Sequence, residues 1–329
     1  MSIHSLAVGL AMMISAAAGA QSTAAPLELE ARIPLGAVSG RIDHLAVDLK
    51  RQRLSVAELG NDTIGVVNLA ARKMQRTMLG YKEPQGIAYE SSTDALYVAN
   101  GGDGSVRILR ADDLTLLQRI DLGQDADNVR VDVARKRVLV GYGKGALALI
   151  DPSSRKKVAD IRLQAHPESF QIDESGSRAF VNVPDAGQIA VVDLGKGEQV
   201  GTLSTQGHRA NFPMAFDHET HRVLVAFRSP ARLLVLSTND GTVVADLDTC
   251  GDADDVFVDP KRHRVYVTCG AGVVDIFEDQ AGKYQRVGHI GTAPGARTGL
   301  FVPELDRLFV AVRATGQEPA AIWVFRPSP

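Results

Sequence analysis

Two stretches of the sequence repeat an acidic phrase whose side chains could hold a cation. Residues 123–132 read GQDADNVRVD and residues 250–259 read CGDADDVFVD, so both contain Asp-Ala-Asp followed by Asn or Asp and then Val. Crowded carboxylates repel one another unless a cation or a basic side chain neutralises them. A divalent cation is therefore one expected partner, and its candidate ligands are Glu58, Asp254 and Asp255.

The donor types leave the identity of this cation open. Ca²⁺ or Mg²⁺ suits oxygen ligands, whereas His44 and His166 could help to hold Zn²⁺. Arginines offer an alternative that needs no metal, because segments of the same kind contain arginines that could pair with the acids. These are Arg209, Arg228, Arg297 and Arg313.

Two histidines could act as general bases in a reaction. His44 follows Asp43 directly, and His166 lies two residues before Glu168, so each imidazole has a carboxylate nearby that could orient it or shift its pKa. The candidate catalytic residues are therefore His44, His166 and Glu168. The alternative is that each imidazole only hydrogen-bonds the backbone of a loop.

A repeat of short strands must position these residues. The segments HLAVD, GIAYE, NVRVD, SFQID, PMAFD, DVFVD and GLFVP begin at residues 44, 86, 128, 169, 213, 255 and 299, at intervals of 41 to 44 residues. Each is followed by a turn and by further strands with apolar residues at every second position. Such a repeat predicts antiparallel four-stranded meanders, one in each unit.

The seventh repeat predicts how the units close into a ring. It ends after its third strand, and an unmatched strand at residues 27–36 resembles the fourth strands of the other units. A ring in which this strand completes the last sheet would leave no sheet edge unpaired. We therefore expect an all-β fold, a seven-bladed β-propeller of four-stranded antiparallel blades, whose last blade is completed by the N-terminal strand.

Several strands resemble a known repeat. The stretch LYVAN at residues 96–100, with its relatives RVYVTC and RLFVAV, is similar to the YVTN-type repeat of YncE-like seven-bladed propellers, over essentially the whole predicted mature chain. The resemblance implies the fold. Similar propellers include lactonases, lyases and binding proteins, so it implies no single activity.

Propeller topology gathers distant residues at one mouth of the central channel. The segments that enter each inner strand and the hairpins between second and third strands lie on the same rim, and their polar residues differ from blade to blade. Such differences are expected in a pocket, where each ligand atom needs its own partner. The candidate ligand-binding residues are Asp43, Asn100, Asp127, Asn128, Asn182, Asn211, Arg228, Arg297 and Arg313.

Other repeated residues have a structural interpretation. An Asp at the end of an inner strand precedes an Arg by five residues in five blades, and we expect this pair to stabilise its own hairpin. The pairs are Asp48 with Arg53, Asp132 with Arg137, Asp173 with Arg178, Asp217 with Arg222 and Asp259 with Arg264.

The two cysteines should pair. Cys250 precedes the acidic phrase of blade six, and Cys269 ends the second strand of the same blade. In an exported protein, a disulfide between Cys250 and Cys269 is expected, and it would brace the loop between them.

The start of the chain predicts export. Residues 1–20 contain the apolar run LAVGLAMMISAAAGA and end in small residues, as in a secretory signal peptide cleaved near Ala20 and Gln21. An uncleaved membrane anchor is the alternative. The predicted organisation is a signal peptide at residues 1–20 and one propeller domain at residues 26–329, periplasmic or secreted, with no membrane span after cleavage.

Charge and motifs limit the functions that the chain could have. The net charge is −3 and no run of five or six like charges occurs, so nucleic acid is not the expected partner. The expected partner is a small molecule at the channel mouth. Two hypotheses remain, a metal-assisted hydrolase or lyase and a propeller that binds a ligand or a protein without catalysis.

Overall fold

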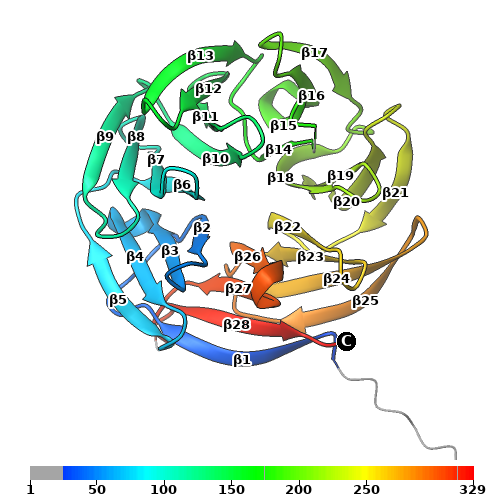
Figure 1. Ribbon diagram of the computed structural model, residues 1–329. Coiled ribbons are helices and arrows are strands. Elements are labelled where there is room, and N and C mark those ends of the chain that lie inside the picture. The colour runs from blue at the N-terminus through cyan, green and yellow to red at the C-terminus, as the bar shows by residue number, and fades with distance from the viewer. Residues whose placement is uncertain (1–24, 174, 317) are drawn as a thin grey trace, which may run out of the picture.

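The protein is a ring of seven sheets around a central axis (Figure 1). The computed structural model describes residues 25–173, 175–316 and 318–329. In this part of the chain, 28 strands form seven four-stranded antiparallel sheets, which confirms the predicted seven-bladed propeller. The predicted signal peptide, residues 1–20, lies outside the described residues.

Each blade contributes one strand to each of four concentric layers. The innermost strands are β2 (Leu45–Asp48), β6 (Pro84–Glu90), β10 (Ala126–Asp132), β14 (Phe170–Ile172), β18 (Arg209–Asp217), β22 (Ala253–Asp259) and β26 (Gly299–Val302). The second strands are β3 (Arg53–Glu58), β7 (Ala95–Asn100), β11 (Arg137–Tyr142), β15 (Arg178–Val183), β19 (Arg222–Ser229), β23 (Arg264–Cys269) and β27 (Arg307–Val312). The third strands are β4 (Thr63–Asn68), β8 (Ser105–Arg110), β12 (Ala146–Asp151), β16 (Gln188–Asp193), β20 (Ala231–Ser237), β24 (Val273–Gln280) and β28 (Ala321–Pro327). The outer strands of blades one to six are β5 (Lys73–Met78), β9 (Leu116–Asp121), β13 (Lys156–Arg162), β17 (Glu198–Leu203), β21 (Val243–Asp248) and β25 (Lys283–Gly291), and that of blade seven is β1 (Leu27–Pro34).

Apolar residues hold neighbouring blades together. The second and third strands are buried on both faces, because a blade lies on each side, and β7 is buried at every position. Tyr97 and Ile108 of blade two, for example, pack in one cluster with Val129, Val140 and Ile150 of blade three. The repeated alternation of apolar residues therefore produces seven interfaces between blades.

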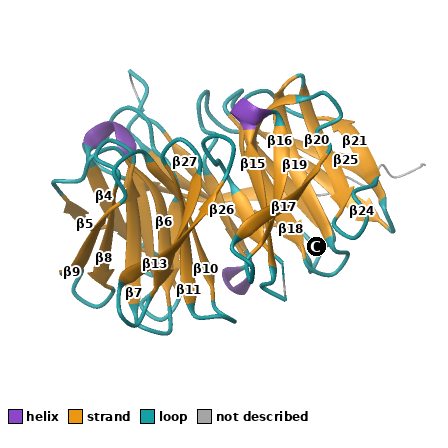
Figure 2. Ribbon diagram, turned by 90° about the horizontal axis from the view of Figure 1, so that it is seen from above, coloured by secondary structure: helices purple, strands orange, loops and turns teal. Residues whose placement is uncertain are grey.

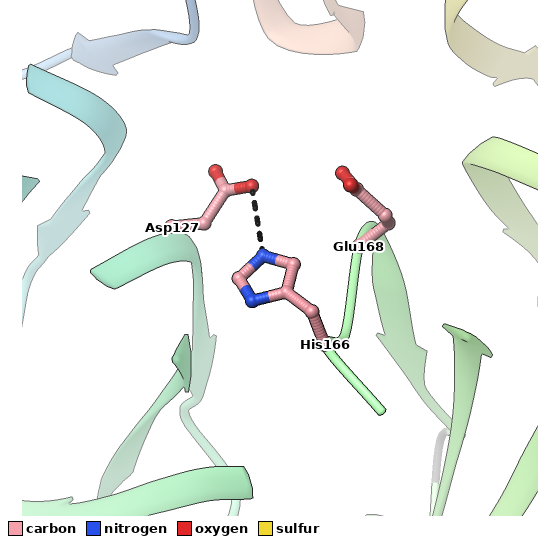
Figure 3. A group of neighbouring side chains, drawn as sticks. All are labelled: Asp127, His166 and Glu168. Carbon is pink, nitrogen blue, oxygen red and sulfur yellow. Dashed lines mark ion pairs between the residues drawn. The ribbon is translucent and has the colours of Figure 1, made fainter. Parts of the chain in front are cut away.

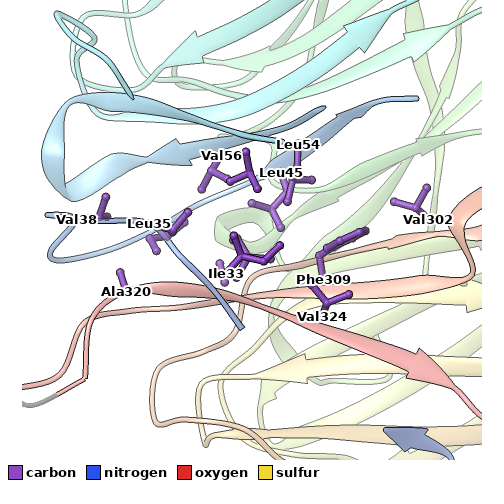
Figure 4. Packing of buried hydrophobic residues seen from close by; sticks show 14 residues of the cluster. Ile33, Leu35, Val38, Leu45, Leu54, Val56, Val302, Phe309, Ala320 and Val324 are labelled. Atoms are coloured by element: carbon purple, nitrogen blue, oxygen red, sulfur yellow. The ribbon is translucent and has the colours of Figure 1, made fainter. Parts of the chain in front are cut away.

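The first strand closes the ring as predicted. Strand β1 pairs antiparallel with β28, from Leu27 opposite Pro327 to Pro34 opposite Ala321. Ile33 of this strand is buried against Phe309 and Val324 of blade seven, in a cluster that also contains Leu54 of blade one (Figure 4). The closing strand thus fills the interface between the last and first blades.

The repeated arginines form some of the predicted hairpin pairs and also connect neighbouring blades. The predicted ion pair within one hairpin forms between Asp132 and Arg137, at 2.9 Å, and between Asp173 and Arg178, at 3.1 Å. All five arginines reach the next blade, because the long guanidinium side chain extends beyond its own narrow hairpin. Arg53 donates to Ala111 O and Asp112 O, Arg137 to Gly176 O and Leu194 O, Arg178 to Thr238 O and Arg264 to Ser328 O, and Arg222 pairs with Asp279.

The two rims of the ring differ in the hairpins that they carry (Figure 2). Hairpins between first and second strands form the far rim, which includes the short helix η3 (Pro303–Leu305). Hairpins between second and third strands form the mouth rim, which includes η1 (Leu59–Asn61) and η2 (Pro184–Ala186). None of the helices in the described ranges has the length and hydrophobicity needed to span a membrane.

Candidate functional site

Two connected cavities lie on the axis at the mouth rim. The outer one, the mouth cavity, has a volume of about 200 Å³, and the inner one, the constriction, has a volume of about 30 Å³. The mouth cavity is lined by Arg41, Gln85, Asp125, Asp127, His166, Glu168, Phe212, Arg228, Asp254 and Arg297. The constriction is lined by Arg41, Asp43, His44, Asp127, Asn128, Glu168, Ser169, Phe212, Asp254, Asp255 and Thr298.

Both acidic phrases reach this site. The DADN loop, residues 125–128, includes the first residues of β10, and the DADD loop, residues 252–255, includes the first residues of β22. In each loop the register of the first two strands shifts, between Ala126 and Val129 in one blade and within Ala253 to Asp255 in the other. Such bulges redirect side chains at the end of a sheet, and the carboxylates of Asp127 and Asp254 both line the mouth cavity.

The DADN loop meets two predicted catalytic residues from blade four. Asp127 Oδ2 lies 3.8 Å from His166 Nε2, and ligand atoms of Asp127, His166 and Glu168 all lie within 4.8 Å of one another. Figure 3 shows the three side chains pointing into the same space. The structure thus groups two predicted catalytic residues with a predicted ligand-binding residue.

A backbone carbonyl orients the imidazole of His166. His166 Nδ1 lies 2.6 Å from Gly143 O, and since a carbonyl oxygen can only accept, Nδ1 carries the proton. Nε2 therefore faces the two carboxylates. Burial lowers the pKa of His166, but the contacts with Asp127 and Gly143 outweigh it and raise this pKa to about 9.

Glu168 is the most perturbed carboxyl group of this half of the site. Burial raises the pKa of Glu168 to about 8, and the negative charge of Asp127 adds to the rise while His166 opposes it. A carboxyl group of this kind is protonated at neutral pH unless a cation displaces the proton. Repulsion between Asp127 and Glu168 is thus relieved either by a proton or by a metal.

The DADD loop is neutralised by arginines instead. Arg228 contacts Asp254 and stacks over the ring of Phe212, with its Cζ 4.2 Å from the ring centroid. Arg297 Nε lies 3.0 Å from Asp254 Oδ2, and Arg297 Nη1 lies 2.9 Å from Asp252 Oδ1. Burial raises the pKa of Asp254, while Arg297 and Arg228 counteract the rise.

A third group of charges comes from blade one. Asp43 Oδ1 lies 2.7 Å from His44 Nδ1, and Asp43 Oδ2 lies 2.8 Å from Arg41 Nη2. Burial opposes the charge of both partners, but their contact raises the pKa of His44 to about 9 and lowers that of Asp43. His44 is therefore an imidazolium at neutral pH, which suits a proton donor better than the predicted general base.

The constriction contains buried polar atoms without a partner among the described residues. Asp127 and Asn128 are 6% and 2% exposed, and the Oδ1 atoms of both accept no hydrogen bond. Asp255 Oδ2 accepts from the Gly299 backbone at 2.8 Å, and burial raises the pKa of Asp255 to about 7. Buried acceptors without donors are costly in a folded protein and indicate a place for a ligand, an ion or water.

Four predicted site residues lie inside the blades instead. Glu58 is fully buried, with its carboxyl group against Thr63, so it does not join Asp254 and Asp255 as the predicted metal ligands. Asn100, Asn182 and Asn211 are also fully buried. They support the mouth: Asn182 Nδ2 donates to Phe212 O at 3.0 Å and Asn211 Nδ2 donates to Asn182 Oδ1 at 3.1 Å.

Two arginines of the mouth rim lie differently from what the sequence predicts. Arg313 lies over Gly295, where an added Cβ would come within 1.7 Å of its guanidinium, and it lines neither cavity. Arg41 lines both cavities, although it is not among the predicted site residues. The signal was present, because Arg41 lies two residues before Asp43 in the segment that enters blade one.

The side chains around the DADN loop would suit a cation better than the predicted ligands Glu58, Asp254 and Asp255 do. Asp127, His166 and Glu168 supply two carboxylates and one imidazole, and three protein ligands with an open position are typical of catalytic zinc. The 3.8 Å from His166 Nε2 to Asp127 Oδ2 is near the edge of a zinc coordination tetrahedron, about 3.4 Å. The Gly143 carbonyl fixes the imidazole from behind, as a hydrogen-bond acceptor commonly does for a histidine that binds a metal.

The predicted disulfide lies beneath the DADD loop. Cys250 and Cys269 are joined by a disulfide, with Cα atoms 5.9 Å apart. Both half-cystines are buried among Ala253, Val267 and their neighbours. The bridge therefore fixes the start of the loop to the second strand of blade six.

Comparisons with known proteins agree with this fold. No protein-family model matches the chain. Two curated proteins, both described as uncharacterized protein YncE, from Salmonella typhimurium and Salmonella typhi, are 22% and 21% identical to it over 195 residues, 57% of this chain and 54% of theirs. The chain thus spans about half the length of the curated relatives it matches.

Solved structures of low sequence identity share the architecture. Hydrazine synthase of Kuenenia stuttgartiensis matches with a TM-score of 0.76 at 16% identity, over 94% of this chain and 99% of that chain. A chain of the mitotic checkpoint complex matches with a TM-score of 0.77 at 13% identity, over 98% of this chain and 99% of that chain. These similarities concern the fold alone. The seven blades and the weak sequence similarity make the chain a seven-bladed β-propeller that resembles YncE.

Proposed function

We propose that the protein is an exported propeller that binds a divalent cation and a polar small molecule at the channel mouth, and that it is a hydrolase or a lyase. The observation that carries this proposal is the group of Asp127, His166 and Glu168 in the mouth cavity, with ligand atoms within 4.8 Å of one another. The Cys250–Cys269 disulfide supports export to a periplasmic or secreted location, since disulfides persist in oxidising compartments.

The residues of the mouth would divide the work between binding and proton transfer. Asp127, His166 and Glu168 would hold the cation, which when bound polarises a carbonyl group or activates water. His44, charged at neutral pH, would donate a proton to a leaving oxygen. Arg41 would hold oxygen atoms of the substrate near the constriction.

Cation binding should depend strongly on pH. His166 must lose the proton on Nε2 and Glu168 must ionise before they can act as ligands, and their pKa values are raised to about 9 and about 8. Each group therefore competes with the metal through a proton. We expect affinity for Zn²⁺ to rise steadily between pH 6 and pH 9.

Calorimetric titration of the folded protein with ZnCl₂ at pH 8 tests the proposal. We expect one ion per chain, removable by EDTA, and a loss of affinity of about tenfold or more in Asp127→Asn, because a ligand is replaced by a weaker one. Asp254→Asn is the matched control, since it changes the equivalent residue of the other acidic loop and should leave Zn²⁺ affinity unchanged. A protein that binds no stoichiometric cation, or an Asp127→Asn variant that binds it equally well, contradicts the metal site.

Catalysis is tested separately from metal binding. A chromogenic lactone such as dihydrocoumarin is a suitable probe, because a cation beside a carbonyl group would accelerate its hydrolysis. Turnover that EDTA abolishes and Zn²⁺ restores supports the hydrolase.

Binding without catalysis is the second candidate function. It is favoured by the DADD half of the site, where Arg228 and Arg297 already neutralise Asp254 without a metal. The same network would present guanidinium and carboxylate groups to a polar ligand or to a protein partner. Metal-independent affinity for a small molecule, with no turnover of it, would support this candidate.

A further inference from the structure

A third cavity continues the axis below the constriction. This channel cavity has a volume of about 340 Å³ and shares His44 and Asp255 with the constriction. It extends along the inner strands toward the far rim, and its walls are largely apolar. They include Val47, Tyr89, Val131, Met214, Phe257 and Leu300.

One charged residue interrupts the repeat in this cavity. Arg130 is the third residue of the NVRVD segment and lines the channel cavity. The same position in the other six blades carries no charge. These residues are Ala46, Ala88, Gln171, Ala215, Phe257 and Phe301.

The guanidinium of Arg130 has no carboxylate partner. It donates to Val129 O at 2.9 Å and to Ser169 Oγ at 3.2 Å, and its Cζ lies 5.7 Å from the centroid of the Phe170 ring. No carboxylate among the described residues lies within 4.0 Å of it, in contrast to Arg228 and Arg297. Arg130 is only partly exposed, and the carboxylates of Asp255 and Asp127 act on it from beyond ion-pair distance. A desolvated guanidinium without a directly paired anion is costly, so a bound anion would stabilise it.

Other polar groups of the cavity do not replace such an anion. Asp255 and His44 lie at its upper end and carry opposite charges when both are ionised. Gln171 Nε2 donates to Met214 O at 2.9 Å, and the hydroxyl group of Tyr89 donates to Asp94 Oδ1 at 2.8 Å. Arg130 therefore remains as the donor available to a ligand in this space.

We propose that the channel cavity binds a small carboxylate with an apolar body. The carboxylate accepts hydrogen bonds from Arg130, as planar guanidinium groups favour. The apolar body lies along the inner strands, where residues such as Val131, Met214 and Phe257 exclude water. This site is separate from the mouth cavity, which Arg130 does not line, and does not depend on the proposed metal.

Octanoate is the probe, with octanamide as its uncharged counterpart. Calorimetric titration at pH 7 should show that the wild-type protein binds octanoate, and that octanamide binds about tenfold or more weakly, because it lacks the charge that Arg130 recognises. Arg130→Gln should lose octanoate affinity by a similar factor. Gln occupies the equivalent position in blade four, at Gln171, so the variant has a side chain that the fold accommodates.

Two further variants separate this site from others. Arg130→Lys keeps the charge and should recover part of the affinity that Arg130→Gln loses. Glu198→Gln removes a carboxylate from the exposed outer strand β17, which does not line the channel cavity, and should bind octanoate as the wild-type protein does. The proposal is overturned if the folded wild-type protein does not bind octanoate, if octanamide binds equally well, or if Arg130→Gln keeps full affinity.

Discussion

The DADN and DADD loops have similar backbones and opposite electrostatic surroundings. Asp125 and Asp252, the first residues of the two loops, both adopt positive φ angles, 28° and 59°, and a register shift follows in each blade. Asp127 nevertheless faces His166 and Glu168, whereas Asp254 contacts two arginines. The repeat determines where a carboxylate points, and the neighbouring blades determine what it meets.

The neighbours explain how one repeat can produce two kinds of site. The blade after the DADN loop supplies His166 and Glu168, and the blade after the DADD loop supplies Arg297. The blade before the DADD loop also supplies an arginine, Arg228, to Asp254. A duplicated acidic loop can thus acquire a metal-binding or an ion-paired role through changes in adjacent blades.

The largest expected effect comes from the disulfide, which only the DADD loop has. The residues of the DADN blade that correspond to the half-cystines are Gly123 and Tyr142. Replacing Cys250 and Cys269 together by Ala should lower the free energy of unfolding by about 3 kcal/mol, because the unfolded chain regains freedom. Urea unfolding measures this. Reductant should lower the stability of the wild-type protein by the same amount and leave the double variant unaffected. If the variant is as stable as the wild-type protein, the disulfide does not brace the loop.

The next effect separates the two carboxylates directly. Asp254→Asn should lower the free energy of unfolding at pH 7 by about 2 kcal/mol, since it leaves two guanidinium groups facing an amide. Asp127→Asn should change it by less than about 0.5 kcal/mol, because it also relieves repulsion with Glu168. Chemical unfolding of both variants without metal measures the difference. Equal losses would show that the two loops do not differ electrostatically.

The pH dependence of the free energy of unfolding should reveal that the carboxyl groups around the DADN loop have no arginine partner in the part of the chain that the structure describes. The pKa of Glu168 is raised from 4.5 to about 8 in the folded protein, so the folded state holds this proton more tightly and loses stability as pH rises through that window. Glu168→Gln cannot ionise. It should match the wild-type protein at pH 5 and exceed its free energy of unfolding by about 2 kcal/mol at pH 9, less than the full pKa shift would give because Glu168 is partly exposed to solvent.

A surface variant controls for general effects of removing a carboxylate. Glu198 is exposed on the outer strand β17, so Glu198→Gln should follow the wild-type pH profile. If Glu168→Gln also follows that profile between pH 5 and pH 9, Glu168 is not the perturbed group.

The smallest effect concerns the position at which the two loops differ, Asn128 in the DADN loop and Asp255 in the DADD loop. Asp255→Asn gives the DADD loop the residue of the DADN loop and keeps an acceptor for the Gly299 backbone. Because the pKa of Asp255 is raised to about 7, the group is mainly neutral at pH 6. The free energy of unfolding at pH 6 should therefore change by less than about 0.5 kcal/mol. A larger loss in thermal or urea unfolding would mean that the charge itself is needed there.

The fold was predictable because its signals are local and repeated. Period-two strands, turn residues and the unmatched strand at residues 27–36 each indicate one feature of the ring, and the structure confirms them together. The Asp and Arg repeat was also visible, but the reach of Arg222 to Asp279 in the next blade was not, since it depends on how closely blades pack.

The site was predictable as a place but not as a set of contacts. Topology assigned Asp127, His166 and Asp254 to one mouth, and they line one cavity. The same reasoning selected Glu58 and Asn182, whose side chains turn into the blades. Their direction depends on the register within each hairpin, and a residue's rim position alone does not reveal it.

The pairing of β1 with β28 affects how this protein can fold during its synthesis. Thr298 donates to Ile42 O across 256 residues of sequence, at the seam where the last blade meets the first. During synthesis, the early blades can assemble while this seam is still open. Arg297 reaches the mouth only with the final blade, whereas Asp127, His166 and Glu168 belong to blades that are synthesised much earlier. The DADN half of the pocket can therefore assemble before the DADD half is complete.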